Sequence, residues 1–175
     1  MQWETPIADV ASPIAKSGPN LLCPPEALAL PAALDINAAL LANNHIGDHG
    51  GPAVRETIRR LEEAGIRTVG AGATPEEACR PLFFETPAGR LALLNVAEHE
   101  FGTVSPAAPG NAPLSPLANI RAIRDARAQA NLVVIAVHGG HERNPMPSPR
   151  MMETYRAFAD AGAAAVFNCH THCPQ

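Results

Sequence analysis

Apolar runs of strand length alternate along this chain with segments whose apolar residues recur at the spacing of a helix. Strands are predicted within residues 35–42 and over residues 67–69, 82–86, 91–97, 132–137 and 163–167. Helices are predicted over residues 51–64, 75–79, 149–161 and from 115 or 116 to about 130. Pro87-Ala88-Gly89-Arg90 separates two of the strands and is typical of a hairpin. The pattern therefore predicts one α/β domain over residues 1–175, with a mixed sheet flanked by helices.

Two segments lack clear periodicity. Residues 1–34 are rich in proline, and we expect them to form loops and short turns. Proline cannot donate a hydrogen bond to a strand ladder, so no central strand is expected there. Residues 102–115 carry three prolines and two glycines, which indicates a long loop.

Four of the apolar runs end in a burst of polar residues. The bursts cover residues 43–49, 98–100, 138–142 and 168–172, and they contain all seven histidines of the chain. In an α/β sheet the carboxyl ends of neighbouring strands meet at one edge, and ligands bind at that edge. The sequence therefore predicts a histidine-rich site at the carboxyl ends of the strands.

The residue types in these bursts point to a divalent metal ion. Neutral imidazole with carboxylate or amide oxygen suits Zn, Mn or Fe, and no thiolate set indicates a closed structural site. His170 and His172 are two residues apart, so on an extended chain they face the same side. The two glycines after His138 would let the backbone approach a bound ion or phosphate closely. A serine hydrolase is disfavoured, because no G-x-S-x-G elbow exists and Ser148 lies between prolines.

Composition and charge exclude several classes of protein. The formal net charge is −4 without any cluster of Lys or Arg, which argues against a nucleic-acid partner. No apolar run approaches the roughly 20 residues needed to span a bilayer. The N-terminus has no visible signal peptide, and a cytoplasmic location is therefore favoured. The four cysteines lack paired CxxC spacing, and we expect them to be buried free thiols.

The motifs at the strand ends resemble those of the CapA family. These are capsule or poly-γ-glutamate synthesis proteins with a calcineurin-like metallophosphoesterase fold. Asn43-Asn44-His45, Asp48 and Gly50 are similar to the "NNHxxDxG" core of that family. Further similarity lies in residues 64–72, 97–101, 138–142, 147–150, 160–163 and 170–172, and residues 16–21 match a segment of one branch. Several motifs in the right order, over nearly the whole chain, make the resemblance specific.

This resemblance implies roles for the matching residues. His45 looks like the acid that protonates the leaving group, and Asp48 would hold or tune it. The implied metal ligands are one amide, three imidazoles and one carboxylate: Asn44, His138, His170, His172 and Glu4. Glu4 is assigned because Gln2-Trp3-Glu4 lies where the family has Asn-Leu-Glu, although Gln2 departs from that pattern.

The family opens with a strand that ends in Gly-Asp, and this chain shows no such segment before Glu4. The family also continues beyond the motif that His172 matches. We therefore expect an internal piece of a longer protein, an incomplete domain whose unpaired sheet edges favour self-association.

Two functions are compatible with these ligands. The first is a metal-dependent hydrolase of a phosphoester or related bond, with two ions about 3.5–4 Å apart that activate a water. The second is a metal-binding protein without hydrolytic activity that assists assembly or export of an anionic polymer. The substrate would be a small molecule or that polymer. An unrelated amidohydrolase-like activity also stays open, because ancestry does not fix function.

Overall fold

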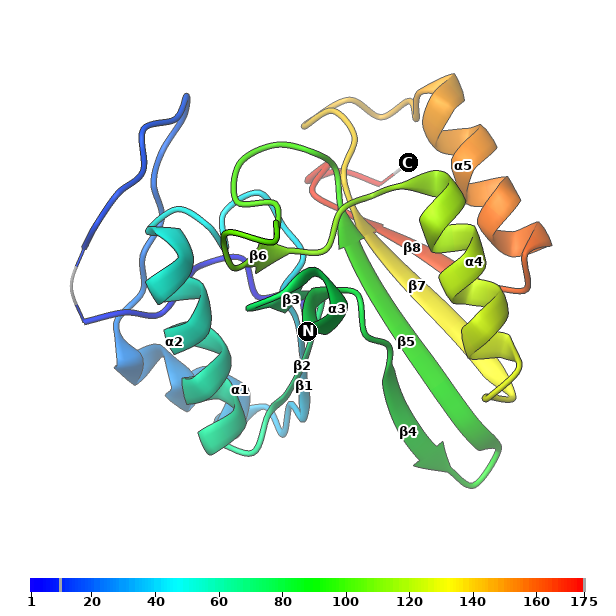
Figure 1. The fold of residues 1–175 in the computed structure, drawn as a ribbon, viewed down its shortest axis with the longest axis horizontal. Coiled ribbons are helices and arrows are strands. Elements are labelled where there is room, and N and C mark those ends of the chain that lie inside the picture. The colour runs from blue at the N-terminus through cyan, green and yellow to red at the C-terminus, as the bar shows by residue number, and fades with distance from the viewer. Residues whose placement is uncertain (10, 175) are drawn as a thin grey trace.

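Two sheets lie next to each other between outer helices in the computed structural model, which describes residues 1–9 and 11–174 (Figure 1). The larger sheet comprises β4 (Leu82–Thr86), β5 (Gly89–Ala97), β7 (Leu132–His138) and β8 (Ala165–Cys169), in that order. The smaller sheet comprises β1 (Ala38–Leu40) and β2 (Arg67–Val69). A third pair joins β3 (Ala71–Gly72) to β6 (Gly110–Asn111).

The longer helices cover the outer faces of these sheets. Helix α2 (Gly50–Glu63) lies outside the smaller sheet, while α4 (Pro116–Arg127) and α5 (Pro149–Asp160) cover one face of the larger sheet (Figure 1). The short helices are η1 (Pro25–Leu28), α1 (Ala29–Ala33) and α3 (Pro75–Ala78). The predicted mixed α/β fold is thus confirmed. Among the described residues, every helix is too short or too polar to reach across a lipid bilayer.

Strand direction brings three of the predicted polar bursts to one edge. β4 and β5 form the predicted antiparallel hairpin, while β5, β7 and β8 run parallel to one another. The carboxyl ends of these three parallel strands therefore lie together, and the burst that follows each strand emerges at the same edge.

Side-chain alternation along β7 determines which way His138 points. Val133, Ile135 and Val137 are fully buried in the core beneath α4 and α5, where Phe158 also packs. His138 follows Val137 and so projects from the opposite face, toward the smaller sheet. The strand thereby buries a polar ring on the face between the two sheets.

The N-terminal residues lie outside the named strands, as the prediction of loop requires, but Gln2 forms an isolated parallel β-bridge with Leu40 of β1. The backbone N–H of Leu40 donates to Met1 O at 2.8 Å, and Trp3 N–H donates to Leu40 O at 3.0 Å. Trp3 is 7% exposed and packs in a second core with Ile7 and Leu61. The residues that pair lie before Pro6, the first proline of the chain, so each of them has a backbone N–H group that can donate a hydrogen bond.

Other differences from the sequence-based expectations are smaller. β1 lies within residues 35–42 as predicted, while the loop predicted over 102–115 contains the two-residue strand β6. The four cysteines are free as expected, but they are not buried: Cys79 is exposed, and Cys23, Cys169 and Cys173 are of intermediate exposure.

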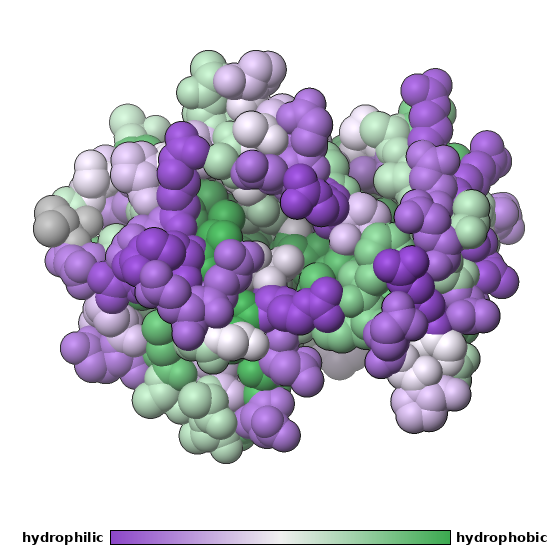
Figure 2. Space-filling model, turned by 60° about the horizontal axis from the view of Figure 1, so that its bottom comes forward, coloured by the Kyte–Doolittle hydropathy of each residue, from purple (hydrophilic) through white to green (hydrophobic). Residues whose placement is uncertain are grey.

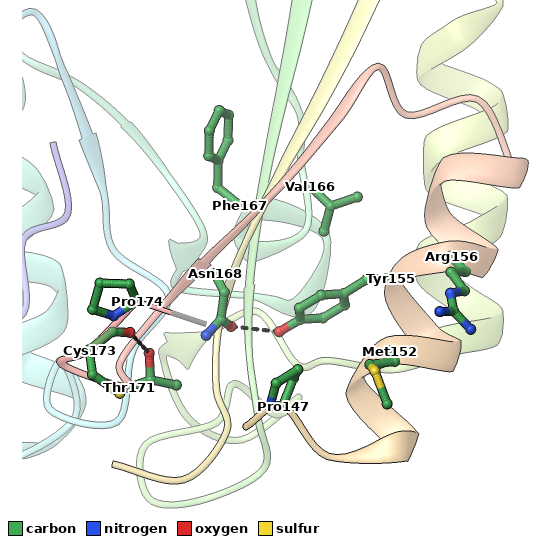
Figure 3. Close-up of a pocket in the computed structure, with 10 residues that line it drawn as sticks. All are labelled: Pro147, Met152, Tyr155, Arg156, Val166, Phe167, Asn168, Thr171, Cys173 and Pro174. Atoms are coloured by element: carbon green, nitrogen blue, oxygen red, sulfur yellow. Dashed lines mark hydrogen bonds between the residues drawn. The ribbon is translucent and has the colours of Figure 1, made fainter. Parts of the chain in front are cut away.

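β8 forms one edge of the larger sheet, and its side chains alternate between two environments. Val166 points toward α5, and Asn168 accepts a hydrogen bond at 2.6 Å from the Tyr155 hydroxyl of that helix (Figure 3). Phe167 points to the other face and is 59% exposed. A cavity of about 430 Å³ lies beside this edge. Viewed from the lower side of Figure 1, hydrophobic surface occupies the middle of the molecule between polar flanks (Figure 2).

We expect the chain to self-associate through this edge, since unpaired strand edges and exposed apolar surface both favour association. Phe167→Lys should shift the population toward monomer, because a charged side chain on an edge opposes pairing. Leu117→Lys is the control, since Leu117 is 74% exposed on α4 and lies away from the edge. Size-exclusion chromatography with light scattering measures both. A wild-type chain that is already monomeric would contradict the expectation.

Candidate functional site

His138 lies at the centre of the polar cluster and is 2% exposed. Its Nε2 lies 3.0 Å from Asn44 Oδ1, which fixes the ring against the turn that follows β1. Its Nδ1 lies 3.7 Å from Glu4 Oε1 and has no hydrogen-bond partner among the described residues. Burial, and to a smaller extent the neighbouring His170, His45 and His172, together lower the pKa of His138 to about 3. The ring is therefore neutral near pH 7, which is the form that binds metal ions.

This lowered pKa makes a prediction for the metal-free protein. Unfolded, His138 binds a proton below about pH 6.5, whereas folded it stays neutral down to about pH 3. The free energy of unfolding should therefore fall as the pH drops through this window, by at most about 1.4 kcal/mol per pH unit from this residue. In His138→Gln the free energy of unfolding, measured by urea denaturation with EDTA present, should fall less steeply as the pH is lowered. Parallel pH curves for the two proteins would refute the assignment.

His170 and His172 follow β8 and approach His138. The ring centroids of His138 and His170 are 4.7 Å apart, and those of His170 and His172 are 6.4 Å apart. Their backbone φ angles are +94° and +53°, so the chain here is not extended. The expectation that an extended chain would place both rings on one side is therefore wrong, although the rings do lie close together. Positive φ at residues other than glycine is uncommon and clusters at functional sites.

The turn after β1 is built around Asn43, which is fully buried. Its Oδ1 accepts hydrogen bonds from the backbone N–H groups of His45 at 2.9 Å and Ile46 at 2.7 Å. Its Nδ2 donates to Trp3 O at 2.9 Å and to Leu41 O at 3.0 Å. Asn43 thus ties the N-terminal segment to the turn and positions the two motif residues that follow it. Sequence reasoning placed Asn43 in the motif but gave it no role.

His45 and Asp48 are in direct contact, as the resemblance implied. His45 Nδ1 lies 2.8 Å from Asp48 Oδ2, and Asp48 is fully buried. Lys16 forms an ion pair with the other carboxylate oxygen, Asp48 Oδ1. Sequence reasoning missed Lys16 as a site residue. The signal that could have found it is that Lys16 is the only lysine of the chain and lies in a segment already matched to the family.

Glu4 reaches the cluster because the N-terminal residues pair with β1. The hydrogen bond from Trp3 N–H to Leu40 O sets the register, and the next residue, Glu4, lies beside His138. The side chain of Glu4 is 28% exposed, so it lines the opening of the cluster and not its floor.

Three of the seven histidines stay outside this cluster. His49 is buried and accepts a hydrogen bond at 2.8 Å from Ser12 N–H. His99 lies in a separate cavity of about 340 Å³, and His141 is exposed. The prediction that strand ends collect histidines therefore holds for four of them, His45, His138, His170 and His172.

The two glycines after His138 serve packing. A side chain at Gly139 would lie within 2.6 Å of Glu98, and one at Gly140 would lie within 2.8 Å of Met151. Gly140 also has a φ of +101° and donates its N–H to Glu98 Oε2 at 2.9 Å. The anion that this backbone approaches is thus the carboxylate of Glu98, which also pairs with Arg150.

Two donor atoms of the cluster, one on His138 and one on Glu4, have a spacing that suits a shared divalent cation. His138 Nδ1 and Glu4 Oε1 are too far apart for a hydrogen bond at 3.7 Å. That spacing is less than twice a usual Zn–N distance of about 2.0–2.1 Å, so one ion can contact both atoms. Over residues 1–9 and 11–174, however, no three His, Cys, Asp or Glu side chains converge as a group that could hold a metal ion. The chemistry of the donors fits, while a converged ligand set is not shown.

These observations define a class of protein: a mixed α/β fold with imidazoles, an amide and a carboxylate gathered at the ends of its strands. Residues 1–175 match the family described as "Bacterial capsule synthesis protein PGA_cap", and the chain belongs to that family. It is 30% identical over 141 residues to the "Capsule biosynthesis protein CapA" of Bacillus anthracis, covering 77% of this chain and 34% of that protein. It is 29% identical over 144 residues to the "PGA biosynthesis protein CapA" of Bacillus subtilis, covering 79% of this chain and 38% of that protein.

A third relative is the "Uncharacterized protein y4sH" of Sinorhizobium fredii, which is 34% identical over 131 residues, or 74% of this chain and 24% of that protein. The matched part of the chain thus spans between 24% and 38% of the length of these curated relatives. The predicted membership of the CapA family is confirmed.

Proposed function

We propose that this chain is the metal-binding part of a hydrolase of a phosphoester or related bond, with a calcineurin-like metallophosphoesterase fold. The observation that carries the proposal is His138, a buried neutral imidazole whose Nδ1 has no hydrogen-bond partner and faces the carboxylate of Glu4. A buried polar atom without a partner calls for an explanation, and the binding of an ion is one such explanation. Membership of a capsule-synthesis family supports a role in capsule or poly-γ-glutamate metabolism.

Five residues would hold the divalent ion or ions, whether Mn, Zn or Fe: Glu4, Asn44, His138, His170 and His172. A bound divalent cation supplies a Lewis acid that polarises a phosphoryl oxygen and stabilises the charge that develops there. Glu4, the one carboxylate of the set, would also repel an anionic substrate when no metal is bound.

His45 would protonate the leaving oxygen. Because Asp48 Oδ2 lies 2.8 Å from His45 Nδ1, the Nδ1–H group donates a hydrogen bond to that carboxylate oxygen, and Nε2 is the nitrogen that would exchange a proton with substrate. Asp48 therefore orients the ring, as the third residue of a catalytic triad does.

A second candidate is a metal-binding accessory protein that assists assembly or export of an anionic polymer without hydrolysing it. The printed names of two relatives favour it, since both describe biosynthesis and neither describes hydrolysis.

Turnover of an aryl phosphate and of an aryl phosphodiester, with added Mn²⁺ or Zn²⁺ and again with EDTA, tests the proposal. A metal-dependent hydrolase should release the aryl alcohol only when the metal is present. Metal binding without turnover of either ester would favour the accessory function.

A further inference from the structure

Lys16 is buried beside the two residues assigned to acid catalysis. Its side chain is 3% exposed, and its ammonium pairs with Asp48 Oδ1. The ammonium also lies 3.3 Å from His45 Nδ1, but an ammonium only donates hydrogen bonds, so it has no hydrogen bond to that nitrogen when Nδ1 carries a proton. Lysine is almost never fully buried unless it is paired, so the carboxylate of Asp48 holds this ammonium inside the protein.

Asp48 uses both of its carboxylate oxygens. Oδ1 pairs with Lys16, while Oδ2 accepts a hydrogen bond from Leu21 N–H at 2.6 Å and lies 2.8 Å from His45 Nδ1. Within the part of the chain that the structure describes, Lys16 is the one Lys or Arg in ion-pair contact with this carboxylate. Asp48 is fully buried, so its charge depends on Lys16 for compensation.

The segment that carries Lys16 is anchored on the same turn as His45. Ile14 N–H donates to Asp48 O at 2.9 Å, and Asn20 Nδ2 donates to Ile14 O at 3.2 Å. Leu21 N–H binds Asp48 as described above. Hydrogen bonds on both sides of Lys16 in the sequence therefore hold its backbone next to Asp48.

We propose that Lys16 is a positioning residue for His45 and acts through Asp48; this rests on the acid role proposed for His45. Lys16 neutralises one oxygen of the carboxylate and so keeps the other oxygen on His45 Nδ1. That contact fixes the Nδ1–H tautomer and leaves Nε2 for proton transfer. Lys16 itself has too little exposure to contact substrate, which separates it from a catalytic residue.

The direct test is the tautomer of His45, read from two-bond ¹H–¹⁵N correlations of ¹⁵N-histidine-labelled, metal-free protein. Wild type should show a single Nδ1–H tautomer for His45. Lys16→Met should replace it with a mixture of tautomers, and Lys16→Arg should restore it because the charge returns. Arg60→Met is the control, since Arg60 pairs with Asp9 and Glu56 away from this site. An unchanged His45 spectrum in Lys16→Met would overturn the proposal.

A second measurement decides the question if Lys16→Met does not fold. Because the chain has one lysine, labelling with ¹⁵Nζ-lysine gives a single ammonium signal. That signal should shift in His45→Gln and stay in place in His141→Gln. If the signal is the same in both variants, Lys16 and His45 are not coupled and the proposal is wrong.

Turnover then separates this proposal from the function on which it rests. With an aryl phosphate as the probe, Lys16→Met should lower kcat by at least about tenfold with little change in KM, because the loss is confined to the transition state. Absence of turnover in wild type would refute the proposed hydrolase, while the His45 tautomer would still decide the role of Lys16.

Discussion

His45→Asn should lower metal-dependent turnover of an aryl phosphate by about 10²–10⁴-fold, the usual cost of removing a positioned general acid. Asparagine cannot supply the proton that the leaving oxygen takes up, so the loss falls on kcat. The affinity for metal should be unchanged, because His45 Nδ1 is occupied by Asp48 and the assigned ligands remain in place.

The control for this variant is His141→Asn, which makes the same change at an exposed histidine outside the cluster. Its turnover and its metal affinity should match those of wild type. If His45→Asn loses metal and activity together, His45 is a ligand and the acid must be sought elsewhere.

His138→Ala should abolish metal binding. His138 is the one imidazole of the cluster that is fully buried, and it contacts both Asn44 and Glu4. Loss of an outer-shell partner alone typically costs about 10–100-fold in metal affinity, so the loss of this ligand should cost at least as much. Isothermal titration of metal-free protein with Zn²⁺ or Mn²⁺ measures the change.

His49→Ala is the matched control, because His49 is also a buried histidine but hydrogen-bonds Ser12 away from the cluster. It should lose some stability, since Ser12 N–H is left without its acceptor, and should keep its metal affinity. Equal loss of affinity in both variants would mean that unfolding, and not a lost ligand, explains the effect of His138→Ala.

The sequence predicted the strands and helices of the larger sheet well because their signals are local. The apolar run that contains Val133 and Ile135 has the length of a buried strand, and the helix patterns end at glycines. His138 and His170 lie at the carboxyl ends of two parallel strands, and the rule that such strand ends meet at one edge predicts that the two residues lie together.

The contacts that the sequence did not predict are long-range or depend on backbone conformation. Trp3 pairs with Leu40, and Lys16 meets Asp48 across 32 positions of the chain, so no local pattern records either contact. The positive φ values at His170 and His172 reverse the simple alternation of an extended strand. The long-range contacts and the backbone conformations both shape the site, and neither follows from a local sequence pattern.

The central claim is that this cluster binds a divalent metal ion through His138. The most direct test is elemental analysis of the purified chain and of His138→Ala, each produced with added Mn²⁺ or Zn²⁺ and then freed of loosely bound ions by gel filtration. The account predicts bound metal in wild type that EDTA removes and that His138→Ala lacks. Metal content in wild type no higher than in His138→Ala would contradict it.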